Sequence, residues 1–351
     1  MDENAGPNRR ARTGLGRFDR MPPDVPHRAR TGPMIHGFSF SAEGSVRPLA
    51  WPPGDEDAAW RWVHLDRTHP DTEPWLRDAL GLSEQIVEGL LDEGTRPRLT
   101  RGEGGLLLIL RGINFNEGQA PEDMVALRLW ITPVLVVSLR RSPILAVHGL
   151  REVYSGGEGP TSPGTFLADL IERLTDSANG VVDDVMAEMD VLEETVVAER
   201  DDEEEGTARR ISGVRRRLVR LRRYLAPQRD ALAAFARGGS DLLDETARLD
   251  LIESVEQTQR YVEEIEAARE RAVILSDELA SRADERVSRH SYMLSVAAGV
   301  FLPITFLTGL LGINVGGMPG EGDPDAFWIV VALCAGMALG TLAVFLSRRW
   351  L

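Results

Sequence analysis

The residues that could handle a metal ion gather in the C-terminal part of the chain. Asn314 lies in the segment Gly312-Ile313-Asn314-Val315-Gly316-Gly317. Its amide oxygen can hydrogen-bond the water shell of a divalent cation, and the glycines let main-chain carbonyls approach the same ion. Glu321, Asp323 and Asp325 follow closely, and several copies of these carboxylates would concentrate cations nearby. Gly312, Ile313 and Asn314 are therefore a candidate segment for contact with a hydrated cation.

A line of polar side chains leads toward this segment along what we expect to be one helix. Its members recur at steps that average about 3.5 residues, the period of a supercoiled or bundled helix face. A solvated face and small-residue helix packing are the alternatives, but we favour a hydrated lumen because the line continues toward Asn314. The line begins with Glu256, Gln259, Glu263, Glu266, Glu270 and Val273, continues with the predicted pore-lining residues Asp277, Ser281, Asp284, Ser288, Ser291, Ser295, Ala298, Leu302 and Thr305, and ends at Gly309. Asp277 and Asp284 are the carboxylates expected to bind the metal ion.

Two uncharged segments predict a helical hairpin in a membrane. Residues 291–320 carry no charged side chain, and a second such run, Phe327–Ser347, lies between Trp328 and Trp350 at its ends. Because hydrocarbon offers no partner for free backbone N–H and C=O groups, runs of roughly 20 apolar residues cross it as helices. Arginines flank the hairpin but are absent from its loop, so the positive-inside rule predicts that both termini are cytoplasmic. These arginines are Arg282, Arg286, Arg289, Arg348 and Arg349.

The first membrane segment continues a long predicted helix. No proline or glycine occurs from Asp241 until Gly299, so the helix should run unbroken for about 100 Å, at 1.5 Å per residue. A second stripe along it has the spacing of a packing seam, and no single chain should bury so long a stalk alone. The seam consists of Ile252, Val255, Val262, Ile265, Ala268, Ala272, Leu275, Leu279, Ala283 and Val287. We therefore expect a ring of copies.

The soluble part is predicted to be of the α+β class. Residues 1–33, rich in Arg and Pro, read as a disordered tail, and residues 34–160 read as a cytoplasmic α/β domain with a covered sheet. Its expected strands are Ile35–Phe40, Trp62–Leu65, Leu106–Ile113, Val125–Ile131 and Val134–Leu139 leading to Ile144–Val147, and its expected helices are Glu73–Leu80 and Ser83–Leu91, the latter capped by Ser83. Gly102, Gly104 and Gly105 indicate a hairpin turn.

Residues 161–290 are predicted to form a helical stalk, and residues 291–351 the membrane hairpin. Within the stalk, helices 165–201 and 207–237 should be antiparallel, with arginines of the second opposite acids of the first. The turn Gly238-Gly239-Ser240-Asp241 should end one helix and cap the next.

Composition excludes several functions. The formal net charge of −15 argues against nucleic-acid binding, and the one cysteine, Cys334, excludes a cysteine-based zinc cluster within a subunit. No phosphate-binding loop, nucleophile elbow or metalloprotease motif occurs, so we expect neither an enzyme nor a catalytic cofactor. His64 and His69, near Asp66 and Asp71, could form a metal site, although a strand-end histidine is more often packed or solvated.

The segment around Asn314 carries a resemblance to a family. Gly312-Ile313-Asn314 between two C-terminal spans resembles the Gly-x-Asn signature of the CorA-type metal-ion transporter superfamily. The isoleucine and the following Gly-Gly-Met-Pro-Gly resemble its ZntB zinc-transporter branch rather than the Gly-Met-Asn of magnesium channels. Soluble segments that also look like that branch are His64-Leu65-Asp66, Trp75-Leu76, Thr95-Arg96-Pro97-Arg98, Leu110-Arg111-Gly112-Ile113-Asn114 and Pro121-Glu122-Asp123-Met124-Val125.

This resemblance implies a homopentameric funnel in a bacterial inner membrane, with the long helix around a central pore and Asn314 at the outer mouth. It implies zinc uptake coupled to protons. Asp277, Asp284 and His290 are the candidate titrating groups. A passive channel for magnesium, cobalt or nickel, and a membrane oligomer that transports nothing, remain the alternatives.

Overall fold

The N-terminal part of the chain forms a seven-stranded mixed sheet with strand order β2-β1-β3-β7-β6-β5-β4. The strands are β1 (Met34–Phe40), β2 (Val46–Pro48), β3 (Trp60–Asp66), β4 (Arg98–Gly102), β5 (Gly105–Gly112), β6 (Val125–Ile131) and β7 (Leu135–Arg140). All neighbours are antiparallel except the central pair β3 and β7. The computed structural model describes residues 32–54, 58–198, 204–239, 241–313, 320 and 322–347, and the chain divides after Leu275 into two compact units.

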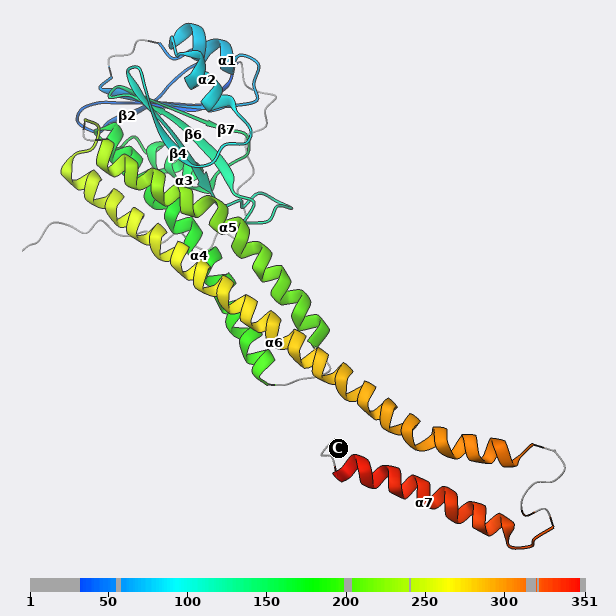
Figure 1. Cartoon of the computed structure of the whole chain (residues 1–351). Helices are drawn as coiled ribbons and strands as arrows, with labels where there is room; N and C mark the ends of the chain where they lie inside the picture. Colours follow the sequence, from blue (N-terminus) through cyan, green and yellow to red (C-terminus); the bar gives the residue numbers. More distant parts are fainter. Residues whose placement is uncertain are drawn as a thin grey trace, which may run out of the picture. The chain divides into compact units, whose positions relative to one another are not determined.

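Helices cover both faces of the sheet, which explains its nearly continuous apolar strands. On one face pack α1 (Thr72–Pro74), η2 (Trp75–Ala79) and α2 (Glu84–Leu91), and on the other pack α3 (Leu145–Tyr154) and the upper parts of three long helices (Figure 1). Residues that alternate along β5 enter different cores: Leu108 and Leu110 lie in the large core with Phe166, and Leu107 and Ile109 in the smaller core. The covered sheet expected from the sequence is confirmed.

Several elements of the structure differ in detail from those predicted from the sequence. Ile144–Val147 was expected to be extended, but helix α3 begins at Leu145, because its apolar residues also fit the helical spacing of Val147 and Leu150. Ser83 is the first residue before α2, yet its side chain accepts no capping hydrogen bond. Strands β2 and β4 were not predicted. The turn at Gly104, whose φ is +79°, is confirmed, because it joins β4 and β5 as a hairpin.

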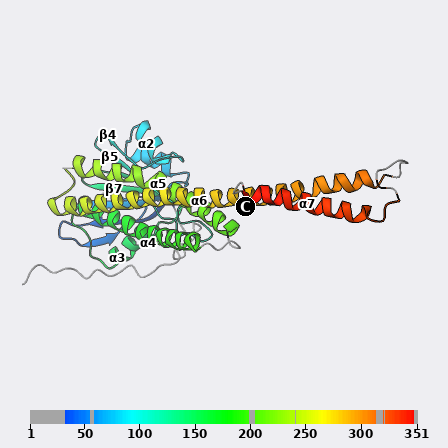
Figure 2. The ribbon, with the colours of Figure 1, turned by 60° about the horizontal axis from the view of Figure 1, so that its bottom comes forward.

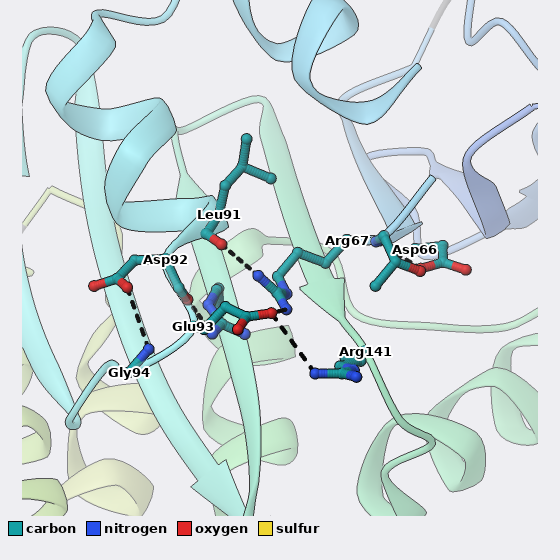
Figure 3. A network of polar contacts seen from close by, with 9 residues as sticks. Asp66, Arg67, Leu91, Asp92, Glu93, Gly94 and Arg141 are labelled. Carbon is teal, nitrogen blue, oxygen red and sulfur yellow. Dashed lines mark hydrogen bonds and ion pairs between the residues drawn. The ribbon is translucent and has the colours of Figure 1, made fainter. Parts of the chain in front are cut away.

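Buried arginines clamp the segment that follows α2 (Figure 3). Arg67 donates a hydrogen bond to the carbonyl of Leu91 and forms an ion pair with Glu93 at 3.2 Å. The Nη2 of Arg128 donates to the carbonyl of Asp92 at 2.5 Å. Burial, together with the nearby positive charge of Arg67, lowers the pKa of Arg128 to about 10. Cations thus satisfy carbonyls at the C-terminal end of α2, where the helix dipole favours them.

The long helices α4 (Pro163–Val197), α5 (Glu204–Gly238) and α6 (Glu245–Leu311) form a bundle in the first unit. Ser162 caps α4 by accepting a hydrogen bond from the amide of Thr165 at 3.2 Å. Helices α4 and α5 are antiparallel (Figure 1), and Arg217 binds Glu188 across them at 2.6 Å, as the charge pattern predicted. Helix α5 ends at Gly238, as expected of the turn 238–241, but that turn does not cap the next helix: α6 begins at Glu245, and the carboxylate of Asp244 accepts from the amide of Ala247 at 2.8 Å.

Helix α6 is unbroken for 67 residues, as expected. The packing seam predicted along it, however, extends further than the residues that are buried. Val262, Ile265, Ala268, Ala272, Leu275 and Leu279 are buried against the rest of the single chain. Ile252 is 37% exposed and Val287 is 64% exposed, so neither belongs to the seam within one chain. The expectation that one chain cannot bury its stalk therefore holds only beyond Leu279.

Candidate ion pathway

Two helices are long and apolar enough to cross a membrane. They are α6, through its C-terminal part, and α7 (Ala326–Ser347), and neither apolar stretch is buried inside the chain. Both lie in the unit that begins at Ser276, where they run side by side (Figure 1).

Helix α7 covers one face of the apolar part of α6. The tightest contact joins Gly299 and Phe345: a Cβ on Gly299 would lie 3.3 Å from the phenyl ring. Pro303, one turn later, leaves the carbonyl of Gly299 without its usual helical donor. The partly covered residues define the contact face: Tyr292, Val296, Gly299, Val300, Pro303, Ile304, Leu307 and Leu311 on α6, and Ala326, Val330, Cys334, Met337, Ala338, Thr341 and Phe345 on α7. This contact face was not predicted from the sequence, although the steps of three and four residues between its members in α7 are a signal that could have revealed it.

The predicted pore line lies outside that contact face. Within the apolar part, Ser291, Ser295, Ala298 and Leu302 each precede a contact residue by one position, which rotates them by about 100° around the helix. The described side chains of Ser281, Asp284, Ser288, Ser291, Ser295, Ala298, Leu302 and Thr305 are all exposed in the single chain. Ser295 donates its hydroxyl to the carbonyl of Ser291 at 2.9 Å, so its oxygen lone pairs remain available to water. The line is therefore open to other copies of the chain or to a lumen.

The two carboxylates expected to bind metal do not form a site within one chain. Asp277 and Asp284 are exposed on α6 and lie two helical turns apart, about 10 Å at 1.5 Å per residue. In the part of the chain that the structure describes, no cluster of three or more His, Cys, Asp or Glu side chains could hold a metal ion. His64 is buried in the sheet with Nδ1 2.7 Å from the Ser138 hydroxyl, so the histidine site considered from the sequence does not form. Among the described residues of one chain, neither carboxylate therefore has the further ligands that a metal ion needs.

The structure describes only the residues on either side of the predicted ion-binding mouth. Asn314 and Glu321 lie outside the described residues. Gly312 and Ile313 follow the end of α6 and are both exposed. On the far side of the loop, the Asp323 carboxylate accepts from the amide of Asp325 at 2.9 Å, which fixes the turn into α7. Gly322 has a φ of +94°, a conformation that other residues rarely adopt. Asp323 and Asp325 are exposed, as cation-attracting carboxylates must be.

Replacing Glu321, Asp323 and Asp325 together by Asn or Gln should reduce metal uptake most at low ionic strength. The reason is that attraction between exposed charges is screened over about 10 Å at 0.1 M salt. Uptake rates of the triple variant and the unaltered chain, measured in liposomes from 10 mM to 500 mM inert salt, should converge as the salt rises. An equal loss at every salt concentration would indicate direct coordination instead.

Comparisons with known proteins agree with this arrangement. Residues 57–349 match the family model described as CorA-like Mg2+ transporter protein. The chain is 40% identical over 83% of its length to the divalent cation transporter CmaX of Pseudomonas aeruginosa, covering 87% of that protein. It is 34% identical over 90% of its length to the zinc transport protein ZntB of Yersinia enterocolitica, covering 96% of that protein. The solved structure of full-length CmaX matches with a TM-score of 0.77 and 37% identity, over 92% of this chain and 99% of that one.

Proposed function

Because the chain belongs to the family of CorA-like Mg2+ transporters, we propose that it is a zinc transporter whose central pore is lined by α6 in a homopentamer. The relatives are named as transporters of divalent cations rather than as enzymes, and no catalytic cofactor is part of the proposal. The divalent cation is the cargo.

The observation that carries the pore assignment is the position of the serine line relative to α7. Helix α7 covers the face of α6 that contains Gly299 and leaves Ser291, Ser295 and Thr305 exposed. Hydroxyls facing lipid would gain little, whereas hydroxyls facing a hydrated lumen replace part of an ion's water shell. Five copies of α6 would enclose such a lumen and lead it to Asn314.

Zinc is the proposed cargo for two reasons. Relatives named ZntB match nearly the whole chain, and the tripeptide Gly312-Ile313-Asn314 has isoleucine where magnesium channels have methionine. Coupling to protons would use carboxylates near the apolar segment, and Asp284 is the acid of the line closest to it. With both termini cytoplasmic in a bacterial inner membrane, uptake would run from the mouth toward the soluble domain.

A passive channel is the second candidate. The family model is named for magnesium, and the relative CmaX is named only for divalent cations. Leu302 is the bulkiest member of the line's upper half, so a dewetting gate of apolar rings has few residues to form it. That composition favours the polar transport path.

Uptake into proteoliposomes separates the candidates. We expect zinc to enter faster when the outside is more acidic than the inside, and magnesium to enter more slowly than zinc. Uptake that ignores the pH gradient and favours magnesium would support the passive channel. An Asp284→Asn variant should retain zinc uptake at a reduced rate and lose most of its dependence on the gradient.

A further inference from the structure

The outer sides of α4 and α5 carry opposite charges. On α5, Arg215, Arg216, Val219 and Arg223 are exposed on one side of the helix, and we call this set the arginine face. Within the described residues, Arg215 and Arg216 form no ion pair or hydrogen bond, unlike their neighbour Arg217, which binds Glu188. A hollow of ≈ 430 Å³ lies on this face between Ser212 and Arg220. So many unpaired like charges on one helix repel each other, which makes a partner of opposite charge favourable.

The acidic face of α4 supplies the complementary charge. It consists of Asp183, Asp184, Val191 and Glu194, all exposed. Each face also carries one exposed valine, Val191 at 50% and Val219 at 49%. The chain is acidic overall, with a net charge of −15, so a cluster of unpaired arginines is best matched by another part of the same kind of chain.

The charges on the two faces lie at matching heights along the bundle. The contact between Glu188 and Arg217 sets a common level on the antiparallel helices α4 and α5. Counting from it in opposite directions at about 1.5 Å per residue, Arg223 lies level with Asp184 to within about two residues, and Arg215 lies within about four residues, about 6 Å, of the level of Glu194, a gap that a long arginine side chain can span. A rotation about an axis along the bundle keeps heights unchanged. It therefore brings opposite charges together.

The faces also point in suitable directions. Helices α4 and α5 lie on the two sides of α6 (Figure 2). On α6, Glu266 forms an ion pair with Arg222 of the same chain at 2.7 Å. Part of the negative charge of α6 is therefore neutralised within the chain. If α6 faces a central axis, the flank of one subunit that carries α5 meets the flank of the next that carries α4.

We propose that the arginine face of α5 docks on the acidic face of α4 of the next copy of this chain, in a head-to-tail contact that closes the ring. The contact rests on the homopentamer of the proposed function. It deepens that proposal, because two unlike faces produce a cyclic assembly and disfavour a two-fold dimer. The ion pairs mainly specify the register of neighbouring subunits.

Charge exchange on the full chain in mild detergent tests the contact, with the number of copies counted by native mass spectrometry. R215E/R223E and D184R/E194R should each convert the five-copy ring mostly to single chains. The fourfold variant, R215E/R223E/D184R/E194R, should restore the ring, which excludes misfolding as the cause. R77E/E84R reverses as many exposed charges on the far side of the sheet and should leave five copies.

Each other outcome overturns the contact in a distinguishable way. An unaltered chain that forms no ring contradicts the proposed assembly itself. A ring that survives R215E/R223E, or a fourfold variant that stays dissociated, contradicts only the contact between these faces. If R215E/R223E keeps five copies but loses bound anionic lipid, the arginine face binds the membrane instead of a neighbour.

Cross-linking gives an independent reading of the head-to-tail geometry. In a Cys334→Ser background, V191C/S212C should form a ladder of linked species up to five copies with a short bifunctional thiol reagent. Val191→Cys or Ser212→Cys alone should remain unlinked, because each meets the other face and not itself. Dimers formed by a single-cysteine variant would reveal a two-fold contact and refute the proposal.

Discussion

Asn314→Ala should abolish metal uptake into proteoliposomes, reducing it to the rate of empty vesicles, while the chain still assembles. The amide oxygen of Asn314 is the one side-chain group of the tripeptide that can hold an ion's water shell, and a methyl group cannot replace it. Because the residue lies beyond the end of α6 at Leu311, its side chain should contribute little to helix packing. The measurement is initial zinc influx at equal protein content, with assembly checked on the same sample.

Leu339→Ala is the matched control for this prediction. Leu339 is 67% exposed on the side of α7 away from α6, so its truncation removes an apolar side chain from the membrane segment without touching the proposed pathway. Normal uptake by Asn314→Ala would show that the mouth lies elsewhere. Loss of uptake in both variants would point to a general effect on the membrane hairpin.

Cysteines on the pore line should react rapidly with a small water-soluble thiol reagent, whereas cysteines in the buried seam should be protected. Ser281, Ser288 and Ser291 are the test positions, and Leu275 and Leu279, which are 8% and 7% exposed, are the controls. The reagent attacks the thiolate, and a thiol whose pKa rises by one unit through burial loses about tenfold in thiolate at neutral pH. Reaction rates in assembled protein lacking Cys334 provide the measurement.

The reverse pattern would contradict the proposed orientation of α6. Ala283 and Val287 are not suitable controls, because they are exposed in the single chain even though they continue the spacing of the seam. If the seam positions react and the serine positions stay protected, the line of serines packs between subunits and the lumen lies on another face.

The sequence predicted the elements with a strong period and missed those with a weak one. The unbroken helix α6 follows from the absence of Pro and Gly over its soluble part, and the α4–α5 pair follows from opposite charges such as Glu188 and Arg217. Strand β2 spans only three residues, too short for any period to be visible. The run at Ile144 fits both a strand and the start of a helix, and only its packing in the large core decides between them.

The extent of the seam depends on tertiary structure that no local pattern records. The spacing on α6 continues to Val287, but α4 ends at Val197, near the level where Arg271 binds Glu193. Further along α6, Ala283 and Val287 are exposed within the described part of the chain. For the pathway, motif and charge located the candidate residues, whereas the face that α7 covers became visible only in three dimensions.

The most direct test of a pathway along α6 is zinc uptake by a single-cysteine variant, Ser295→Cys in a Cys334→Ser background, before and after treatment with a charged thiol reagent. Ser295 lies on the open line of α6, and Leu339→Cys in the same background is the matched control on the outer side of α7. A lumen along this line predicts that the reagent stops uptake through Ser295→Cys and leaves Leu339→Cys unaffected. Full modification of Ser295→Cys with unchanged zinc uptake would contradict the pathway.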